Sequence, residues 1–212
     1  RETTTSDDIG LSLEQMDFFL LESKGKPHEI VMHWQLAHGL RISEALGMMW
    51  DDIDFAQDPI QVLRDVSDIA RSTLEGTRWA EGEGPIVTGT KTANSRREIP
   101  LQARTKALLE QTPAEDRHGY IYATSKGRPV LPSRYRRSVF NPLRKRLDVE
   151  WATPHDLRKG FGSVAIINGV EVMTLSHWMG HSSPNVTMRI YAKVLPESEK
   201  WHKNTIGKAL FR

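Results

Sequence analysis

The 212-residue sequence contains no cysteine. Disulfide bonds, thiol nucleophiles and cysteine-based zinc sites are therefore excluded, and the composition fits a reducing compartment. The sequence also lacks an uninterrupted apolar run long enough to span a membrane, and it contains no internal repeat or low-complexity tract. Hydrophobic residues make up 38% of the chain, which is enough for one sizeable domain with its own core.

A net charge of only +2 hides an uneven distribution of charge along the sequence. Residues 1–125 contain 13 Lys and Arg against 21 Asp and Glu, whereas residues 126–212 contain 16 against 6. An acidic half joined to a basic half indicates a surface directed at a polyanion. The alternative, which the composition leaves open, is that these charges are only solvated.

The hydrophobic pattern predicts a mainly α-helical domain with a small antiparallel β-sheet in its N-terminal half (α+β). Ser12 and Gln15 form a capping-box pattern at the start of the first helix. The other expected helices cover residues 28–38, 41–50, 102–111, 133–147, 154–168, 171–179, 184–194 and 197–210. The expected strands cover 60–65, 84–90 and 96–101, with 92–95 as a hairpin tip between the last two and 67–83 as a loop or insertion. Pro142 lies within one expected helix and should kink or break it.

The stretch ATPHDLRKG predicts a helix N-terminus, with Thr153 as N-cap, Pro154 at the first helical position and Asp156 completing a capping box. His155 and Arg158 are three residues apart and share one face of this helix start. Because free N–H groups and the helix dipole favour anions there, the two side chains would complete a phosphate site. The alternative is an ordinary helix start with a salt-bridged arginine.

Two further stretches contain cations that have more than one interpretation. In HGLRISEALGMMW, Arg41 and Glu44 form either a surface ion pair or a ligand-binding guanidinium with the carboxylate that holds it. An arginine in that second role can bind two phosphate oxygens at once. In TGTKTANSRREIP, Lys91 is either solvated or a proton donor, because the pKa of a lysine moves readily on desolvation.

The stretch LSHWMGHSSPNVTMRIYAK contains two histidines and a tyrosine. Gly180 is the expected helix stop, and His181 lies in the turn before the next helix. His177 and His181 are four residues apart, but no acidic or cysteine ligand accompanies them, so we expect no metal. Tyr191 is either a core aromatic or, if neighbouring cations favour its phenolate, a nucleophile.

The stretch SRYRRSVFNPLRKRLD is rich in basic residues beside an apolar stripe. This pattern predicts a helix packed on the core with phosphate-contacting side chains outward. A solvated cationic face is an equally good interpretation. The candidate phosphate-contacting residues are Arg134, Arg136, Arg137, Arg144, Lys145 and Arg146.

Taken in order, these stretches resemble the boxes of the tyrosine recombinase (phage integrase) family, from about Leu11 to the end of the chain. HGLRISEALGMMWDDIDF resembles the first box, GTKTANSRREIPL the hairpin with the catalytic lysine, TPHDLRKGFGS the second box and WMGHSSPNVTMRIYAKV the third. Met179 replaces the family's usual leucine, and the 67–83 stretch is longer than the connection often seen. The catalytic residues that the resemblance implies are Arg41, Glu44, Lys91, His155, Arg158, His181 and Tyr191.

The resemblance implies the catalytic domain of a site-specific DNA recombinase or integrase from a phage or mobile element. The tyrosine would attack a DNA phosphodiester and form a 3′-phosphotyrosyl link, without metal, ATP or another cofactor. Arg41, Arg158 and His181 would stabilise the transition state. Lys91 would protonate the leaving 5′-oxygen, and His155 would assist proton transfer or orient the phosphate. The alternatives are strand relaxation like that of a type IB topoisomerase and a catalytically silent DNA-binding module.

The resemblance also implies partners and a location. Double-stranded DNA is the expected partner, and the expected assembly is a homotetramer on DNA in which the tail helix of 196–212 docks on a neighbouring protomer. The alternative is that this helix packs on its own domain. Residues 1–10 would be a linker from missing N-terminal DNA-binding domains, and 11–195 the catalytic domain. We expect no membrane association and no small-molecule cofactor, and a place in the cytoplasm of a bacterial host, at the nucleoid.

Overall fold

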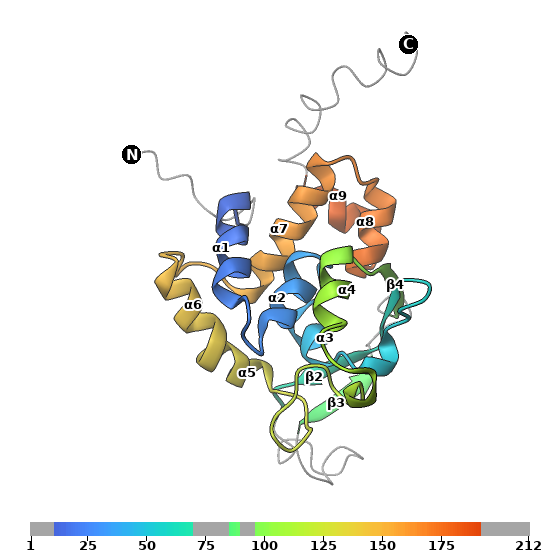
Figure 1. The fold of residues 1–212 in the computed structure, drawn as a ribbon. Coiled ribbons are helices and arrows are strands. Elements are labelled where there is room, and N and C mark those ends of the chain that lie inside the picture. The colour runs from blue at the N-terminus through green and yellow to red at the C-terminus, as the bar shows by residue number, and fades with distance from the viewer. Residues whose placement is uncertain (1–10, 70–84, 90–95, 192–212) are drawn as a thin grey trace.

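The computed structural model describes residues 11–69, 85–89 and 96–191, with side chains up to Ile190. These residues form a mainly helical domain with two short antiparallel strand pairs (Figure 1). The predicted architecture, mainly α with a small antiparallel sheet, is confirmed. The predicted tail helix and hairpin tip, and most of the predicted 67–83 loop, lie outside the described residues.

Helix α2 (Glu29–Leu36) is the centre of the main core, because most of its side chains are buried. Helices α1 (Leu13–Ser23) and α7 (Pro154–Ile167) pack against it. The predicted capping box begins α1: the N–H of Gln15 donates to Ser12 Oγ at 3.2 Å, and the N–H of Ser12 donates to Gln15 Oε1 at 2.9 Å. The local signal therefore fixes the start of α1, and burial of α2 holds the helices together.

Helix α3 (Ile42–Leu46) is much shorter than the predicted helix 41–50. A Cβ on Gly47 would lie 3.3 Å from the backbone oxygen of Arg64, so the end of α3 packs closely on a strand. The chain then leaves the helix, and a 3-10 turn forms at Trp50–Asp52. Tertiary packing thus overrides the helical pattern in the second half of this run.

The described strands form two antiparallel pairs. β1 (Pro59–Val62) pairs with β4 (Arg97–Pro100), and β2 (Arg64–Ser67) pairs with β3 (Ile86–Gly89). β3 and β4 therefore run one after the other, in the same direction, along the segment 59–67. The predicted hairpin between the runs that contain β3 and β4 is wrong, because each run finds its hydrogen-bonding partner in that earlier segment.

The predicted helix 133–147 is divided at its centre. It consists of α5 (Pro132–Tyr135), a π-helical segment (Arg136–Phe140) and α6 (Asn141–Arg146). Pro142 has no N–H to donate, and its ring would collide with a carbonyl one turn earlier in a regular α-helix. The wider π turn just before it relieves that collision, which confirms the predicted disturbance at Pro142.

The C-terminal described helices form a smaller apolar cluster beside the main core. Helices α7, α8 (Val172–Met179) and α9 (Pro184–Tyr191) share this cluster, which is built on Leu175 and Met179. Gly180 ends α8 at φ 59°, as predicted for a left-handed helix stop. The remaining elements are α4 (Ala103–Leu109) and a 3-10 turn at Ala114–Asp116. None of the helices in the described ranges combines the length and apolar character needed to cross a bilayer.

Candidate active site

Glu44 is a buried carboxylate at the start of α3, and it lies at the centre of the site. It accepts hydrogen bonds from the N–H of Arg41 at 2.7 Å and from Arg41 Nη1 at 2.8 Å. The Glu44 side chain is fully buried, whereas 38% of the Arg41 side chain is exposed. The pair is therefore not the surface ion pair that the sequence left open. The buried carboxylate holds a guanidinium that still reaches solvent.

Arg97 is a site residue that the sequence analysis missed. Its Nη1 and Nη2 each donate to a carboxylate oxygen of Glu44 at 2.9 Å, and both side chains are fully buried. The signal that could have found it is strand alternation: Arg97 and Ile99 are the buried positions of β4. A charged residue at an inward position of a strand requires a buried partner.

Arg158 approaches the same carboxylate from α7. Its side chain is 1% exposed, and Nη1 lies 3.8 Å from Glu44 Oε2. Nη1 also donates to the carbonyl oxygen of Gly39 at 2.6 Å, and Nη2 donates to the carbonyl oxygen of Met179. Arg158 thus connects the turn before α3 to the end of α8.

Burial and charge have opposite effects on the pKa of Glu44. Burial alone would raise it, but the hydrogen bonds and charge of Arg97, together with the charges of Arg158 and Arg41, lower it to about 2. The carboxylate is therefore ionised at any physiological pH, and it compensates part of the positive charge of the three arginines.

The last carbonyl groups of α8 accept hydrogen bonds from the same three arginines. Arg97 Nε donates to the oxygen of Trp178 at 2.6 Å. Arg158 donates to the next carbonyl, as described above, and Arg41 Nη2 donates to the oxygen of Gly180 at 3.1 Å. Helix C-termini carry unsatisfied carbonyls and partial negative charge, which cations stabilise. The position of α8 is therefore tied directly to the arginines.

His181 follows this helix end and is half-buried. Its Nδ1 lies 2.7 Å from Thr187 Oγ1, and Thr187 is fully buried in α9. Desolvation, followed by the charges of Arg158, Arg41 and Arg97, lowers the pKa of His181 to about 4. The imidazole is therefore neutral at pH 7, so one ring nitrogen carries a proton and the other accepts.

His155 lies in the first turn of α7 and is exposed. The Asp156 carboxylate accepts from the N–H and the hydroxyl of Thr153 at 2.8 and 2.7 Å, so the helix begins where the sequence predicted. Partial desolvation, then the charges of Arg158 and Lys159, lower the pKa of His155. The histidine is thus within electrostatic reach of the arginine that follows it on the same helix face.

Two predicted catalytic residues are not described at the side-chain level. Lys91 lies outside the described residues, in the segment that joins β3 to β4. Tyr191 is the last residue of α9, and only its backbone is described. Their predicted roles therefore remain predictions.

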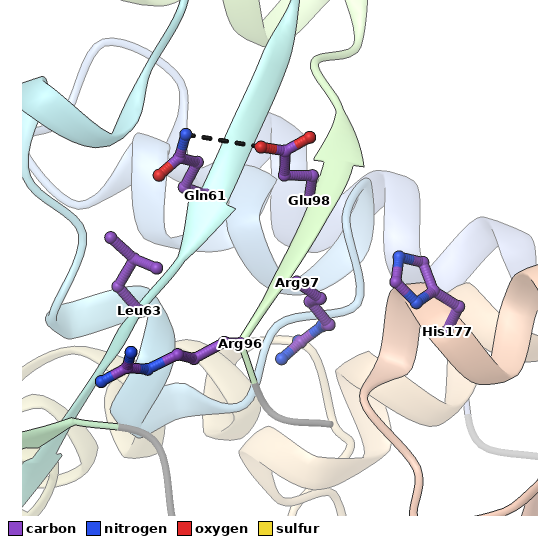
Figure 2. A pocket seen from close by; sticks show the side chains of 6 residues that line it. All are labelled: Gln61, Leu63, Arg96, Arg97, Glu98 and His177. Atoms are coloured by element: carbon purple, nitrogen blue, oxygen red, sulfur yellow. Dashed lines mark hydrogen bonds between the residues drawn. The ribbon is translucent and has the colours of Figure 1, made fainter. Parts of the chain in front are cut away.

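An open pocket of about 380 Å³ lies beside the site. Figure 2 shows Arg96 and Arg97 at the start of β4, with His177 of α8 on the far side of the pocket. Gln61 and Glu98 form a hydrogen bond across the strands at 3.4 Å. Of the predicted catalytic residues whose side chains are described, none lines this pocket. Within the described ranges, no group of three His, Asp or Glu side chains is placed to hold a metal ion.

The candidate DNA-binding cations divide into two groups. Arg136 forms an ion pair with Asp68 at 2.7 Å, Arg144 donates to the carbonyl of Ala152 at 2.8 Å, and Arg146 pairs with a carboxylate of α1 at 3.0 Å. These three side chains have partners within the described residues, and Arg144 is also partly buried, whereas Arg136 and Arg146 remain exposed. The exposed cations for which the described residues supply no ion pair are Arg134, Arg137 and Lys145.

The sequence around this site matches a known family. A family model described as "Phage integrase family" matches residues 11–198. The chain belongs to the phage integrase family. This confirms the resemblance drawn from the four motifs, and the match includes all seven predicted catalytic positions.

Relatives and solved structures agree with this membership. A tyrosine recombinase XerC-like protein of Caldanaerobacter subterraneus subsp. tengcongensis is 26% identical over 191 residues, covering 82% of this chain and 48% of that protein. The chain thus spans about half the length of the curated relatives it matches. The Tn1549 transposon integrase, solved in complex with transposon right end DNA, has a TM-score of 0.71 at 21% identity, over 94% of this chain and 68% of that one. The catalytic domain of bacteriophage HP1 integrase has a TM-score of 0.61 at 18% identity, over 92% of this chain and 94% of that one. These two likenesses show that the fold is shared.

Proposed function

We propose that this chain is the catalytic domain of a site-specific DNA recombinase or integrase, which breaks and rejoins DNA strands through a covalent tyrosine intermediate. The observation that carries the proposal is the convergence of Arg41 and Arg158, from two distant segments of the chain, on the end of α8 directly before His181. The names of the relatives, tyrosine recombinase and integrase, support the same reaction.

The proposed nucleophile is Tyr191. Its oxygen attacks a DNA phosphorus, the bond from phosphorus to the 5′-oxygen breaks, and the enzyme remains linked to the 3′-phosphate. The phosphotyrosyl link keeps the energy of the broken bond, so a 5′-hydroxyl can reverse the step without ATP. Thr187, one turn before Tyr191, contacts His181, so the helix with the nucleophile is attached to the cationic site.

The proposed roles of the cations follow from their charge and position. Arg41 and Arg158 bind the non-bridging oxygens of the phosphate, and neutral His181 adds a hydrogen bond as negative charge develops. Lys91 donates the proton to the leaving 5′-oxygen. His155 assists proton transfer or orients the phosphate.

The test is to trap the covalent intermediate. The chain is incubated with a library of nicked duplexes of randomised sequence, in which the short cleaved fragment diffuses away, and detergent-resistant adducts are isolated and sequenced. We expect a 3′-phosphate linked to Tyr191 and no adduct from a Tyr191→Phe variant. A Tyr120→Phe variant, which removes a phenol outside the site, is the matched control. Absence of an adduct from the wild-type chain, or an adduct that persists in Tyr191→Phe, would contradict the proposal.

The proposed DNA surface includes the exposed cations of the α5–α6 region. Arg134, Arg137 and Lys145 contact phosphates, whereas Arg144 stabilises the protein. Replacing each of the first three with glutamine should reduce the slope of log affinity against log salt by about 1. An unchanged slope in all three variants would show that these side chains are solvated and do not contact DNA.

The proposed assembly and location extend beyond the described residues. Residues 1–10 link the domain to an N-terminal DNA-binding part, 11–195 are the catalytic domain, and 196–212 dock on a neighbouring protomer in a DNA-bound homotetramer. The protein acts at the nucleoid, in the cytoplasm of a bacterial host. Deleting 197–212 should weaken synaptic-complex formation in native gels and leave the urea midpoint unchanged. A full yield of synaptic complex after deletion would refute the docking role.

A further inference from the structure

We propose that Arg97 is a positioning residue for DNA strand cleavage, which holds Glu44 and the end of α8 so that Arg41, Arg158 and His181 share one phosphate. This inference rests on the proposed recombinase function. No motif assigned a role to this residue.

The guanidinium of Arg97 is bound within the protein, because Nη1 and Nη2 donate to Glu44 and Nε donates to the carbonyl of Trp178. Its side chain has no exposed surface, and the carboxylate it binds is equally buried. Figure 2 shows the side chain between the start of β4 and the part of α8 that carries His177, among the residues that line the open pocket. Arg97 therefore acts on a phosphate through the groups that it holds and through its charge.

The first group it holds is Glu44. Two parallel N–H···O bonds of 2.9 Å fix both carboxylate oxygens, and a bidentate pair fixes orientation as well as distance. The same two oxygens accept from the backbone and the guanidinium of Arg41. The orientation of the exposed guanidinium therefore depends on the buried one.

The second group is the turn that leads to His181. Arg97 Nε donates to the carbonyl oxygen of Trp178. A Cβ added to Gly180 would lie 2.8 Å from Arg97 Nη1, so the turn packs directly on the guanidinium. Because His181 follows this turn, a shift of Arg97 moves the turn and the imidazole together.

The third segment near Arg97 is the one that contains Lys91, the proposed general acid. Arg97 is six residues after Lys91 in the sequence and is the first residue of β4. Its bonds attach the start of β4 to the arginine cluster, and that strand follows the segment with the lysine. One buried side chain thus connects β4 to α3 and to the end of α8.

The experiment compares Arg97→Lys with Arg96→Lys. Arg96 is the adjacent, exposed arginine, and both changes retain a positive charge. Lysine cannot reproduce the fork, and a misplacement of about 1 Å can reduce a rate about 100-fold. On nicked duplex recovered from the wild-type adduct, we expect Arg97→Lys to lower the single-turnover cleavage rate about 10- to 100-fold. The Kd of Arg97→Lys for that DNA should stay within about threefold of wild type. The cleavage rate and the Kd of Arg96→Lys should also stay within about threefold of wild type.

Two further readouts separate positioning from general destabilisation. In a Glu44→Gln background, Arg97→Lys should change the cleavage rate only about threefold, because the group through which it acts has already been altered. In Arg97→Met, loss of the bonds that lower the pKa of Glu44 should move the acid limb of the cleavage profile to higher pH. The lysine variant, which keeps the charge, decides the question if the methionine variant does not fold.

A cleavage rate for Arg97→Lys within threefold of wild type would overturn the positioning role. Full additivity of the Arg97→Lys and Glu44→Gln effects would also overturn it, because the two residues would then act independently. Failure of the wild-type chain to form any adduct would instead overturn the proposed function. The two results are therefore distinguishable in one series of reactions.

Discussion

Replacing Glu44 with glutamine removes the negative charge on which three arginines converge, while the size of the side chain hardly changes. Arg97 and Arg158 are buried, with 0% and 1% of their side chains exposed. They would then lie together without a counter-charge in a medium of low dielectric constant. Breaking a buried ion pair by removing one partner costs about 3–5 kcal/mol. This is a large part of the total stability of a domain, which is about 5–15 kcal/mol.

The pKa of Glu44 gives a second value for the free energy by which the charge of Glu44 stabilises the fold. It is about 2 in the folded chain against an ordinary value of 4.5. Because the folded value is the lower one, the stabilisation is fully present above about pH 4.5 and is lost as the pH falls toward 2. At about 1.4 kcal/mol per pH unit, the difference is worth about 3–4 kcal/mol. This value agrees with the cost of breaking the buried ion pair.

Urea unfolding of the wild type and Glu44→Gln at a series of pH values tests this reasoning. With a slope of about 2 kcal/mol per molar urea, we expect the midpoint at pH 7 to fall by about 1.5–2 M, and the two proteins to converge as the pH approaches 2. Glu98→Gln changes an exposed carboxylate to which the described residues supply one hydrogen bond, from Gln61 at 3.4 Å, and it should shift the midpoint by less than about 0.3 M. A Glu44→Gln midpoint equal to that of this control, or an offset independent of pH, would refute the argument.

Three further predictions come from the neighbourhood of the same site. Burial lowers the pKa of His38 to about 4, so stability should decline as the pH falls from 6.5 to 4. In a His38→Asn variant, the free energy of unfolding, measured by urea titration, should not show this loss of about 3 kcal/mol. Gly180→Ala places a Cβ 2.8 Å from Arg97 Nη1 at φ 59°, and should lower the free energy of unfolding by about 1–3 kcal/mol, measured by urea titration. Thr187→Val removes the hydroxyl 2.7 Å from His181 Nδ1, and should reduce single-turnover cleavage about 10-fold while the Kd for DNA is unchanged.

Local chemistry in the sequence predicted the parts of the fold that depend on neighbouring residues. The capping box of Ser12, the start of α7 at Pro154 and the helix stop at Gly180 all form as expected. Each depends on bonds within one turn of helix, so the sequence contains the whole signal. The disturbance at Pro142 is local in the same sense, although its π-helical form was not predicted.

The parts that failed depend on contacts between distant segments. The runs with β3 and β4 have the pattern of a hairpin, but the pairing with 59–67 is decided by long-range packing. Arg97 was overlooked for the same reason. Its neighbour Arg96 has the same chemistry and is exposed, and only the pairing of β4 with β1 turns one arginine inward. Sequence motifs indicated Arg41, Arg158 and the carboxylate of Glu44, and not the second buried arginine that binds this carboxylate.

The charge count of the site explains why a fully buried arginine is useful to a reaction that it cannot contact. Among the described residues around Glu44, Arg41, Arg97 and Arg158 supply three positive charges, Glu44 removes one, and His181 is neutral with a pKa of about 4. In the proposed reaction, a phosphodiester with one negative charge gains a second when the phenolate attacks. The remaining local charge of two therefore matches the transition state rather than the bound substrate, which is the condition for a faster chemical step. Without Arg97, the same carboxylate would leave only one positive charge and would lose the bidentate bond that aligns it. A site with two arginines and one glutamate would then match the ground state better than the transition state.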